Sequence, residues 1–300
     1  LFAAEAVNDL VCAQSAQAAV LAAAQLGGHI SSEFSEMRQQ LVAMCAQFLA
    51  VIDYPDEEIE DLPLSKIRET LDKMQTRLLA LCESYQRGRA LREGLPCAII
   101  GRPNAGKSTL LNALLGYDRA IVTDIAGTTR DTVEETLRLG GLILRLQDTA
   151  GLRETDDPVE QIGVGRARDA VTLAKESGVV LAVFDGSQPL STDDFMVIEQ
   201  VKDAKRAVAV VNKADLSTQM DLTELEGHFA RVVTLSAKQR EGLDALTEAL
   251  TNLTGIHDLP QDGGLITNLR QAEILSHTAQ NLAQASRQLH AGFAPDAVVY

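Results

Sequence analysis

The segment Gly101–Ser108 reads Gly-Arg-Pro-Asn-Ala-Gly-Lys-Ser and fits the pattern G-x-x-x-x-G-K-[ST], which constrains the fold more than any other part of the chain. The pattern is informative when a strand precedes it and a helix follows it, and both are predicted here. Its glycines allow backbone amides to turn inward around a phosphate, and the helix N-terminus adds a favourable dipole. We therefore expect Lys107 to reach the β- and γ-phosphates of a nucleotide and Ser108 to hold Mg²⁺.

Short β-rich runs recur after Leu95, with helical segments between most of them. The predicted strands are Cys97–Ile100, Leu137–Leu139, Leu142–Leu146, Val179–Phe184, Ala207–Val211 and Val232–Leu235. Strand–helix alternation with continuous apolar strands predicts a largely parallel sheet covered on both faces. Residues 142–147 alternate between apolar leucines and other side chains after Gly140-Gly141, which predicts one antiparallel hairpin in this sheet.

The residues on either side of this region are predicted to be helical. They carry three apolar stripes at helical spacing. The stripes consist of Leu41, Met44, Cys45, Phe48, Leu49 and Ile52; of Ile67, Leu71, Met74, Leu78, Leu81 and Tyr85; and of Leu275, Leu282, Ala285 and Leu289. Pro55 disfavours helical geometry at the residue before it, so the first long helix is expected to end near Asp53. The last helix is expected to return and pack on the N-terminal ones.

Three further motifs follow predicted strands. Asp148-Thr149-Ala150-Gly151 places a carboxylate beside the Mg²⁺ shell and the Gly151 amide near the γ-phosphate. In Asn212-Lys213-Ala214-Asp215, the carboxylate of Asp215 can accept hydrogen bonds from both N1–H and the 2-amino group of guanine. Adenine lacks both donors and would leave that carboxylate unpaired, so the motif predicts GTP or GDP. Ser236-Ala237-Lys238 is expected to close the pocket over guanine O6 with a backbone amide.

These motifs predict an α/β P-loop GTPase domain, with a mostly parallel sheet and one antiparallel strand, inserted into an all-α helical domain. The predicted boundaries are residues 1–92 for the first part of the helical domain, 93–256 for the GTPase domain and 257–300 for the returning helical part.

The residues that act on the γ-phosphate are less clearly marked. One of Thr128 and Thr129 is expected to sense Mg²⁺ and the γ-phosphate as a switch, and spacing does not decide which. Leu152 stands where small signalling GTPases carry a glutamine that orients water, so another group must act. The candidates are Glu154, Asp156, Asp157 and Glu160. No arginine finger stands out: Arg102, Arg119 and Arg130 are expected to be surface or salt-bridge residues, and another cation could supply the positive charge.

Composition and cysteine usage exclude several classes. The net charge of −15 repels nucleic acid, so RNA contact needs a local basic patch or a partner. The cysteines Cys12, Cys45, Cys82 and Cys97 form no C-x-x-C pair, and we expect buried, reduced thiols. No apolar run reaches the roughly 18 residues that span a bilayer and no signal peptide is found, so a cytoplasmic protein is expected. Because the chain runs from Leu1 to Tyr300 without an initial Met, we expect a fragment of a longer protein.

At the level of motifs the chain resembles the MnmE (TrmE) family of bacterial tRNA-modification GTPases. The resemblance rests on Gly101–Ser108, on residues 123–131 (Thr-Asp-Ile-Ala-Gly-Thr-Thr-Arg-Asp) and on residues 148–153 (Asp-Thr-Ala-Gly-Leu-Arg). Residues 53–59 (Asp-Tyr-Pro-Asp-Glu-Glu-Ile) and 4–10 (Ala-Glu-Ala-Val-Asn-Asp-Leu) are similar to signatures of that family's helical domain. The resemblance covers nearly the whole chain.

The resemblance implies roles that the spacing did not show. Members bind K⁺ beside the nucleotide, where an arginine finger would lie, and Glu160 matches their catalytic glutamate. The expected K⁺ ligands are Asn104, Thr123, Ile125 and Thr128, and the expected Mg²⁺ ligands are Ser108, Thr129 and Asp148. The full set expected around GTP is Asn104, Ala105, Gly106, Lys107, Ser108, Thr109, Thr123, Thr128, Thr129, Asp148, Gly151, Asn212, Lys213, Asp215, Ser236 and Ala237.

The resemblance also implies partners. The GTPase domains of the family dimerise across the nucleotides, and with the FAD-dependent subunit MnmG the protein modifies carbon 5 of a tRNA wobble uridine, taking a one-carbon unit from a folate. The folate-binding N-terminal domain is expected before Leu1 and a Cys-x-Gly-Lys motif after Tyr300. This chain alone is therefore expected to hydrolyse GTP without completing tRNA modification.

Two other readings remain. A ribosome-assembly GTPase of the Era/Der type shares Leu152 and the N-x-G-K-S loop, but such proteins usually add an RNA-binding domain, and the C-terminal helix here has no basic cluster. A non-catalytic, nucleotide-gated adaptor would use the helical stripes as its working surface. Measurable K⁺-dependent turnover would exclude the adaptor.

Overall fold

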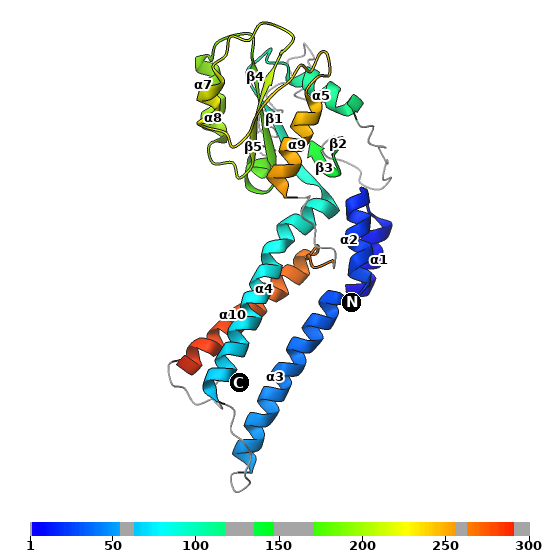
Figure 1. Cartoon of the computed structure of the whole chain (residues 1–300), viewed down its shortest axis with the longest axis vertical. Coiled ribbons are helices and arrows are strands. Elements are labelled where there is room, and N and C mark those ends of the chain that lie inside the picture. The colour runs from blue at the N-terminus through cyan, green and yellow to red at the C-terminus, as the bar shows by residue number, and fades with distance from the viewer. Residues whose placement is uncertain (1, 55–62, 118–134, 147–170, 256–262, 291–300) are drawn as a thin grey trace, which may run out of the picture. The chain divides into compact units, whose positions relative to one another are not determined.

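The computed structural model of the chain describes residues 2–54, 63–117, 135–146, 171–255 and 263–290. The chain divides into two compact units (Figure 1). One comprises Leu1–Arg92 with Leu259–Tyr300, and the other comprises Glu93–Asp258. The second unit is thus inserted into the sequence of the first, and we call them the helical unit and the α/β unit.

A six-stranded sheet in the order β2-β3-β1-β4-β5-β6 forms the centre of the α/β unit. Its strands are β1 (Leu95–Ile100), β2 (Glu135–Leu139), β3 (Leu142–Leu146), β4 (Val179–Asp185), β5 (Ala207–Asn212) and β6 (Val232–Thr234). The β2–β3 pair is antiparallel and joined at Gly140-Gly141, and the other neighbours are parallel. The predicted fold class, including its single hairpin, is confirmed.

Helices cover both faces of this sheet because its central strands β4 and β5 carry apolar side chains on both faces up to their polar last residues. Within the described residues the covering helices are α5 (Lys107–Tyr117), α7 (Thr192–Val201), α8 (Leu222–Glu226) and α9 (Leu243–Thr254). Figure 1 shows α7 and α8 on one side of the sheet and α5 and α9 on the other. Residues on one face of β4 and β5, such as Phe184 and Val211, pack against Val197 and Ile198 of α7 and Leu225 of α8.

The strand order determines where a ligand can bind. From β1 the chain passes to β2 and β3 on one side and then returns to β4 on the other side of β1. Between β1 and β4 the direction of winding reverses, and in open α/β sheets the crevice beyond the carboxyl ends of such strands is the usual ligand site. The loops after β1, β4, β5 and β6 all leave the sheet at this edge, because these strands are parallel.

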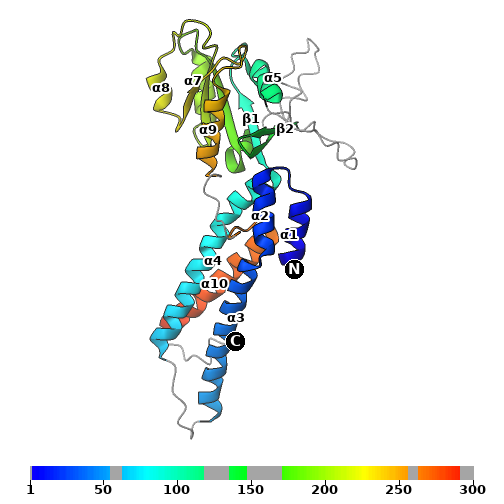
Figure 2. The ribbon, with the colours of Figure 1, turned by 45° about the vertical axis from the view of Figure 1, so that its right-hand side comes forward.

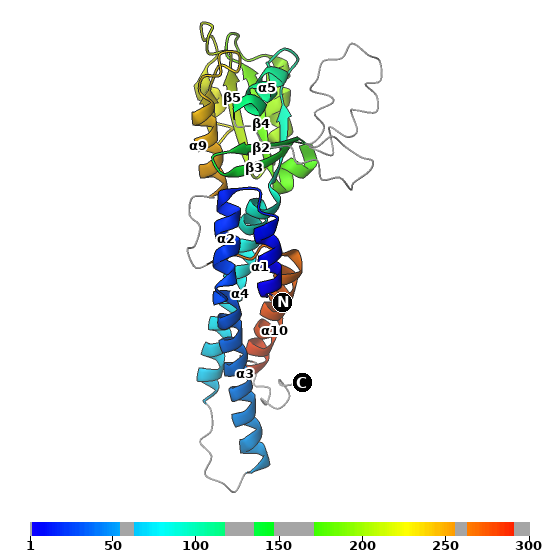
Figure 3. The ribbon, with the colours of Figure 1, turned by 90° about the vertical axis from the view of Figure 1, so that its right-hand side faces the viewer.

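The helical unit contains α1 (Phe2–Val11), α2 (Ala16–Leu26), α3 (His29–Asp53), α4 (Leu64–Glu93) and α10 (Leu269–His290). Figures 2 and 3 show α4 and α10 running alongside each other with α3 beside them. The whole predicted stripe of α4, from Ile67 to Tyr85, is buried against Leu275, Leu282 and Leu289 of α10. The prediction that the last helix returns to the N-terminal ones is therefore confirmed.

The stripe predicted on α3 is less covered than expected. The helix ends at Asp53, as the following proline predicted. Leu41 and Met44 pack partly against the core, but Leu49 is 48% exposed. The expectation of uniformly buried cysteines is also wrong: the four thiols are free, Cys97 is buried and Cys12 is exposed. Burial raises the pKa of Cys97 to about 12, so that thiol is inert at neutral pH.

Buried polar side chains join the two halves of the helical unit. Asp9 of α1 accepts a hydrogen bond from the Thr267 hydroxyl at 2.9 Å and lies 2.9 Å from Nε of Arg92 in α4. The Ser84 hydroxyl of α4 accepts a hydrogen bond from the Ile266 amide. These contacts attach the segment before α10 to the N-terminal helices, which local helix propensity could not do. Among the described helices none has the length and apolarity needed to cross a membrane.

Candidate functional site

The loop between β1 and α5 has the backbone geometry of the predicted phosphate loop. Asn104 and Gly106 have φ values of 62° and 95°, in the left-handed region. The side chain of Lys107 folds back over the loop, and its Nζ donates to the carbonyls of Gly101 and Arg102 at 3.0 Å each. Helix α5 begins at Lys107, so the amides of its first turn lie at the positive end of the helix dipole. This arrangement is suited to an anion.

Asn212, at the end of β5, holds three loops together. Its side chain is buried, and its Nδ2 donates to the Ala105 carbonyl of the phosphate loop at 3.1 Å. Its Oδ1 accepts from the amides of Lys213 at 2.8 Å and Ala237 at 3.0 Å. The structure therefore brings together three of the four predicted motifs. The Ala237 amide, which belongs to the segment predicted to close over guanine O6, already has a partner within the protein.

Gly106 lies directly against the Asn212 side chain. A Cβ atom at this position would lie 2.1 Å from Nδ2 of Asn212, well inside van der Waals contact. The residue also has a positive φ, which L side chains rarely adopt. A larger residue at position 106 would therefore disturb both the phosphate loop and the Asn212 hydrogen bonds.

Asp215 is held in place for the predicted contact with guanine. Its Oδ1 accepts a hydrogen bond from the Ser236 hydroxyl at 2.7 Å, and that hydroxyl in turn accepts from the Gln239 amide. The bond from Ser236 lowers the pKa of Asp215, as do the nearby charges of Lys238 and Lys213. The side chain is thus a carboxylate at neutral pH and can accept two donors at once.

Two acidic residues that the sequence analysis did not single out complete this edge of the sheet. Asp185 ends β4 and lies 2.7 Å from Nζ of Lys213. Asp194 caps α7 together with Ser191 and lies 3.3 Å from Nε of Arg102. The Ser191-x-x-Asp194 spacing was a readable capping signal, but nothing in the sequence linked it to Arg102. As predicted for Arg102, this arginine is engaged in ion pairs.

The other predicted site residues either are more exposed or lie outside the described residues. Asn104 and Thr109 are exposed and Ser108 is half-buried at the start of α5. Thr123, Ile125, Thr128, Thr129, Asp148, Gly151, Glu160 and the arginines Arg119 and Arg130 lie outside the described residues. In the described part of the chain no three His, Cys, Asp or Glu side chains group as they would around a metal. The Ser108 hydroxyl is a hard oxygen donor beside the phosphate loop and so fits Mg²⁺.

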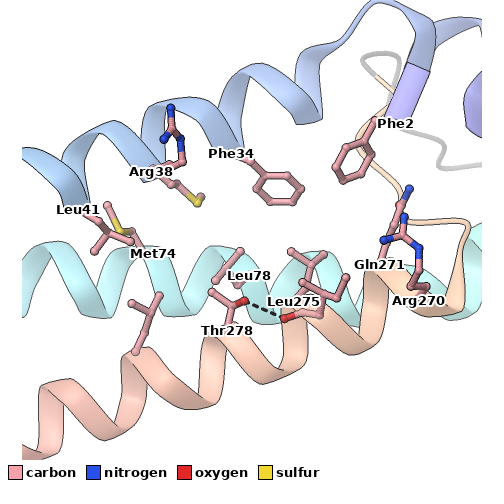
Figure 4. Close-up of a pocket in the computed structure, with 13 residues that line it drawn as sticks. Phe2, Phe34, Arg38, Leu41, Met74, Leu78, Arg270, Gln271, Leu275 and Thr278 are labelled. Atoms are coloured by element: carbon pink, nitrogen blue, oxygen red, sulfur yellow. Dashed lines mark hydrogen bonds between the residues drawn. The ribbon is translucent and has the colours of Figure 1, made fainter. Parts of the chain in front are cut away.

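The helical unit contains a separate cavity of about 350 Å³. Figure 4 shows it between α3, α4 and α10, with Phe2 and Phe34 facing each other near one end and Arg38 pointing away. The two ring centroids are 5.6 Å apart. The remaining lining is mainly apolar and includes Leu41, Met74, Leu78 and Leu275. Such a surface offers no cradle of amides for a phosphate, so the nucleotide site is assigned to the α/β unit.

A family model and three similar sequences give one family. A family model described as the MnmE helical domain matches residues 1–300. The tRNA modification GTPase MnmE of Natranaerobius thermophilus is 37% identical over 298 residues, and the corresponding proteins of a Roseiflexus species and of Oceanobacillus iheyensis are 40% and 39% identical over 307 and 300 residues. Each alignment covers 98% of this chain, and the chain spans 64% of the length of these relatives.

One solved structure is similar to about half of this chain. The G domain of the FeoB iron transporter of T. maritima aligns with 52% of this chain and 96% of its own, at 27% sequence identity and a TM-score of 0.39.

Proposed function

The chain belongs to the MnmE family, and we propose from this membership and from the loop geometry that it binds and hydrolyses GTP within a tRNA-modification enzyme. The observation that carries the proposal is the position of Asn212, which bonds both to the Ala105 carbonyl and to the Ala237 amide. We call residues 101–107 the phosphate loop, residues 212–215 the base loop and residues 236–238 the closing loop, and the Asn212 side chain joins all three. The family match by itself does not locate a nucleotide site. The hydrogen bonds of Asn212 support a GTP site at these loops.

The phosphate side of the proposed site consists of the first turn of α5 and the loop before it. The amides of residues 104–109 and the Lys107 ammonium would surround the β- and γ-phosphates, where Lys107 would exchange its bonds to Gly101 and Arg102 for phosphate oxygens. A bound Mg²⁺ would neutralise charge on these phosphates. Ser108, with Thr129 and Asp148, would supply its protein ligands.

The base side consists of residues 212–215 and 236–237. The Asp215 carboxylate, held by Ser236, would accept hydrogen bonds from N1–H and the 2-amino group of guanine. Adenine would leave this carboxylate without donors, which is costly in a closed site. We therefore propose a preference for guanine over adenine nucleotides.

Hydrolysis would depend on groups in addition to these phosphate-side and base-side residues. We propose that Glu160 orients the attacking water through hydrogen bonds, since Leu152 cannot do so. A K⁺ ion held by Asn104, Thr123, Ile125 and Thr128 would place positive charge near the phosphates. Arg102 is ion-paired with Asp185 and Asp194, and this supports a cation other than arginine in that role.

We propose that the protein acts as a homodimer with the FAD-dependent subunit MnmG on carbon 5 of a tRNA wobble uridine. The folate needed for that step would bind in a domain other than the helical and α/β units. A cytoplasmic location is proposed with these partners.

The test is nucleotide binding and turnover with the purified chain. Fluorescent GDP with Mg²⁺ should be displaced by GTP and GDP but not by ATP, and phosphate release should be faster in KCl than in NaCl. Displacement by ATP, or no binding at all, would contradict the nucleotide assignment. Equal turnover in the two salts would remove the K⁺ proposal, and binding without turnover would leave a nucleotide-gated adaptor.

A further inference from the structure

Arg102 of the phosphate loop is held by side chains from β4 and α7. Its side chain is only 17% exposed, and its Nε lies 3.3 Å from Oδ1 of Asp194. Its Nη2 donates to Oε1 of Gln188 at 2.9 Å and lies 3.8 Å from Oδ2 of Asp185. The phosphate loop is thereby attached to the ends of two neighbouring elements by a charged side chain, in addition to its own backbone turns.

Asp185 lies between this arginine and the base loop. Its Oδ1 accepts hydrogen bonds from the amide and hydroxyl of Ser187, at 3.1 and 2.6 Å. Its Oδ2 accepts from Nζ of Lys213 at 2.7 Å and faces Arg102. One buried carboxylate, 4% exposed, therefore contacts a cation from each of the two loops that would hold the nucleotide.

The charges in this group balance, so neither loop can move independently without cost. Asp185 and Asp194 carry two negative charges, and Arg102 and Lys213 carry two positive ones. Buried charges are tolerated only when they are paired, so removing Asp185 leaves the partly buried ammonium of Lys213 without its anion, while Arg102 keeps only Asp194 as a carboxylate partner. Burial raises the pKa of Asp185, but the bonds from Lys213 and Ser187 outweigh burial and keep its pKa below the usual value.

The base loop also needs this support because its backbone is strained. Lys213 has a φ of 67°, which is uncommon for a residue with a side chain. Its amide is fixed by Asn212 and its ammonium by Asp185. Such a conformation persists where its surroundings over-determine it. Asp215 lies only two residues further along the same loop, so its position depends on how Lys213 is held.

We propose that Asp185 is a positioning residue for guanine recognition, which fixes the base loop to the phosphate loop so that Asp215 meets the 2-amino group of the base. The inference rests on the proposed function. It assigns no contact between Asp185 and the nucleotide. The role of Asp185 is to set the distance between the loops that make contact.

The experiment compares GDP with inosine diphosphate, whose base lacks the 2-amino group. The dissociation constants of both nucleotides are measured with Mg²⁺ for the wild type, for Asp185→Asn and for the control Asp194→Asn, together with each protein's melting temperature. Asp194→Asn loosens Arg102 but leaves the Lys213–Asp185 pair intact. Asp185→Asn should raise the dissociation constant for GDP by about tenfold or more. It should also reduce the preference for GDP over inosine diphosphate by at least about threefold. Asp194→Asn should weaken both nucleotides by the same factor.

The outcomes separate this inference from the proposed function. If the wild type binds neither nucleotide, the proposed function fails. If the wild type prefers GDP and Asp185→Asn weakens both nucleotides equally, Asp185 has only a structural role and the inference is overturned. Should Asp185→Asn fail to fold, Lys213→Gln removes the other partner of the pair at a more exposed position. An unchanged preference for GDP in that variant would equally overturn the inference.

Discussion

Nδ2 of Asn212 donates to the carbonyl oxygen of Ala105 at 3.1 Å, so a side chain at the end of one strand bonds to the backbone of the loop that follows another. Asn212 ends β5 and Ala105 lies in the loop after β1, and the two loops leave the sheet at the same edge because β1, β4 and β5 are parallel. The bond makes the base loop and the phosphate loop one structural unit.

Asn212→Ala should abolish nucleotide binding and destabilise the α/β unit. The change removes three hydrogen bonds and leaves the Ala105 carbonyl and the amides of Lys213 and Ala237 without this partner. A buried group left unsatisfied costs about 1–3 kcal/mol, so we expect a loss of about 3 kcal/mol in the free energy of unfolding. Urea denaturation and fluorescent GDP binding measure the two effects. Wild-type affinity in the variant would contradict the bridging role.

Gly106→Ala should be much more damaging than a matched substitution at Gly28. Both glycines have a positive φ, but a Cβ at Gly106 would lie 2.1 Å from Asn212, whereas no atom lies within 4 Å of a Cβ at Gly28. Backbone strain alone costs about 1–2 kcal/mol, and we expect that loss for Gly28→Ala, with unchanged GDP affinity. Gly106→Ala should add the loss of the Asn212 bonds and weaken GDP by about a hundredfold. Equal effects of the two variants on GDP affinity would refute the clash.

Glu160→Ala should slow GTP turnover without weakening GTP binding. A residue that orients or deprotonates water contributes about 10²–10⁴ in rate, so we expect turnover to fall by at least about a hundredfold and the dissociation constant to change by less than about threefold. Glu154→Ala is the matched control and should hydrolyse GTP at the wild-type rate. The measurement is single-turnover phosphate release in KCl. A slow Glu154→Ala variant beside an active Glu160→Ala variant would reverse the assignment.

The stability that Asp185 contributes should depend on pH in one direction. The pKa of its carboxyl is lowered in the folded protein, so the unfolded chain takes up its proton first as the pH falls. The contribution is therefore complete above the unfolded pKa of about 3.9 and is lost as the pH drops through the lower folded value. The free energies of unfolding in urea of the wild type and Asp185→Asn should differ by a constant amount from about pH 5 to 8. This difference should shrink below about pH 4. A difference that grows on acidification would contradict this.

Asp9→Asn should weaken the helical unit alone. Asp9 is buried and pairs with Arg92 and Thr267, so the change leaves a partly buried guanidinium without its anion. Breaking a fully buried pair costs about 3–5 kcal/mol, and because Arg92 is 32% exposed we expect about 2 kcal/mol. Glu69→Gln, which breaks the exposed pair with Lys73, should cost at most about 0.5 kcal/mol. GDP affinity should be unchanged in both variants, and a loss in Asp9→Asn would show that the two units are coupled.

Much of the fold could be predicted from the sequence because apolar runs mark the strands and turn residues mark the ends of these strands. The strand boundaries were predicted one or two residues short at β1, β2, β4 and β5. Asp185 and Asn212 were left out of their strands because they are polar, although the structure buries both and pairs them across β4 and β5. Pro96 also fell outside the predicted strand, but it lies in β1, opposite Arg145 of β3.

The site was only partly readable for a different reason. Motif residues such as Lys107 and Asp215 follow strands at spacings that chemistry fixes, so their convergence could be predicted. Asp185 and Asp194 belong to no such motif, and their pairing with Arg102 depends on the strand order and on where α7 begins. Sequence spacing does not encode such contacts, because they form only after the sheet has been assembled.

The interrupted helical unit has a consequence for biosynthesis. Its hydrogen bonds join residues far apart in the chain, such as Asp9 with Thr267 and Ser84 with Ile266. A ribosome that has released Glu93–Asp258 has supplied every strand of the sheet but no part of α10. Domains generally fold as units while the chain is being made, so the α/β unit can fold first. Until the last helix emerges, the apolar stripe of α4 is left without the helix that covers it, and at that stage the nascent chain is most vulnerable to aggregation.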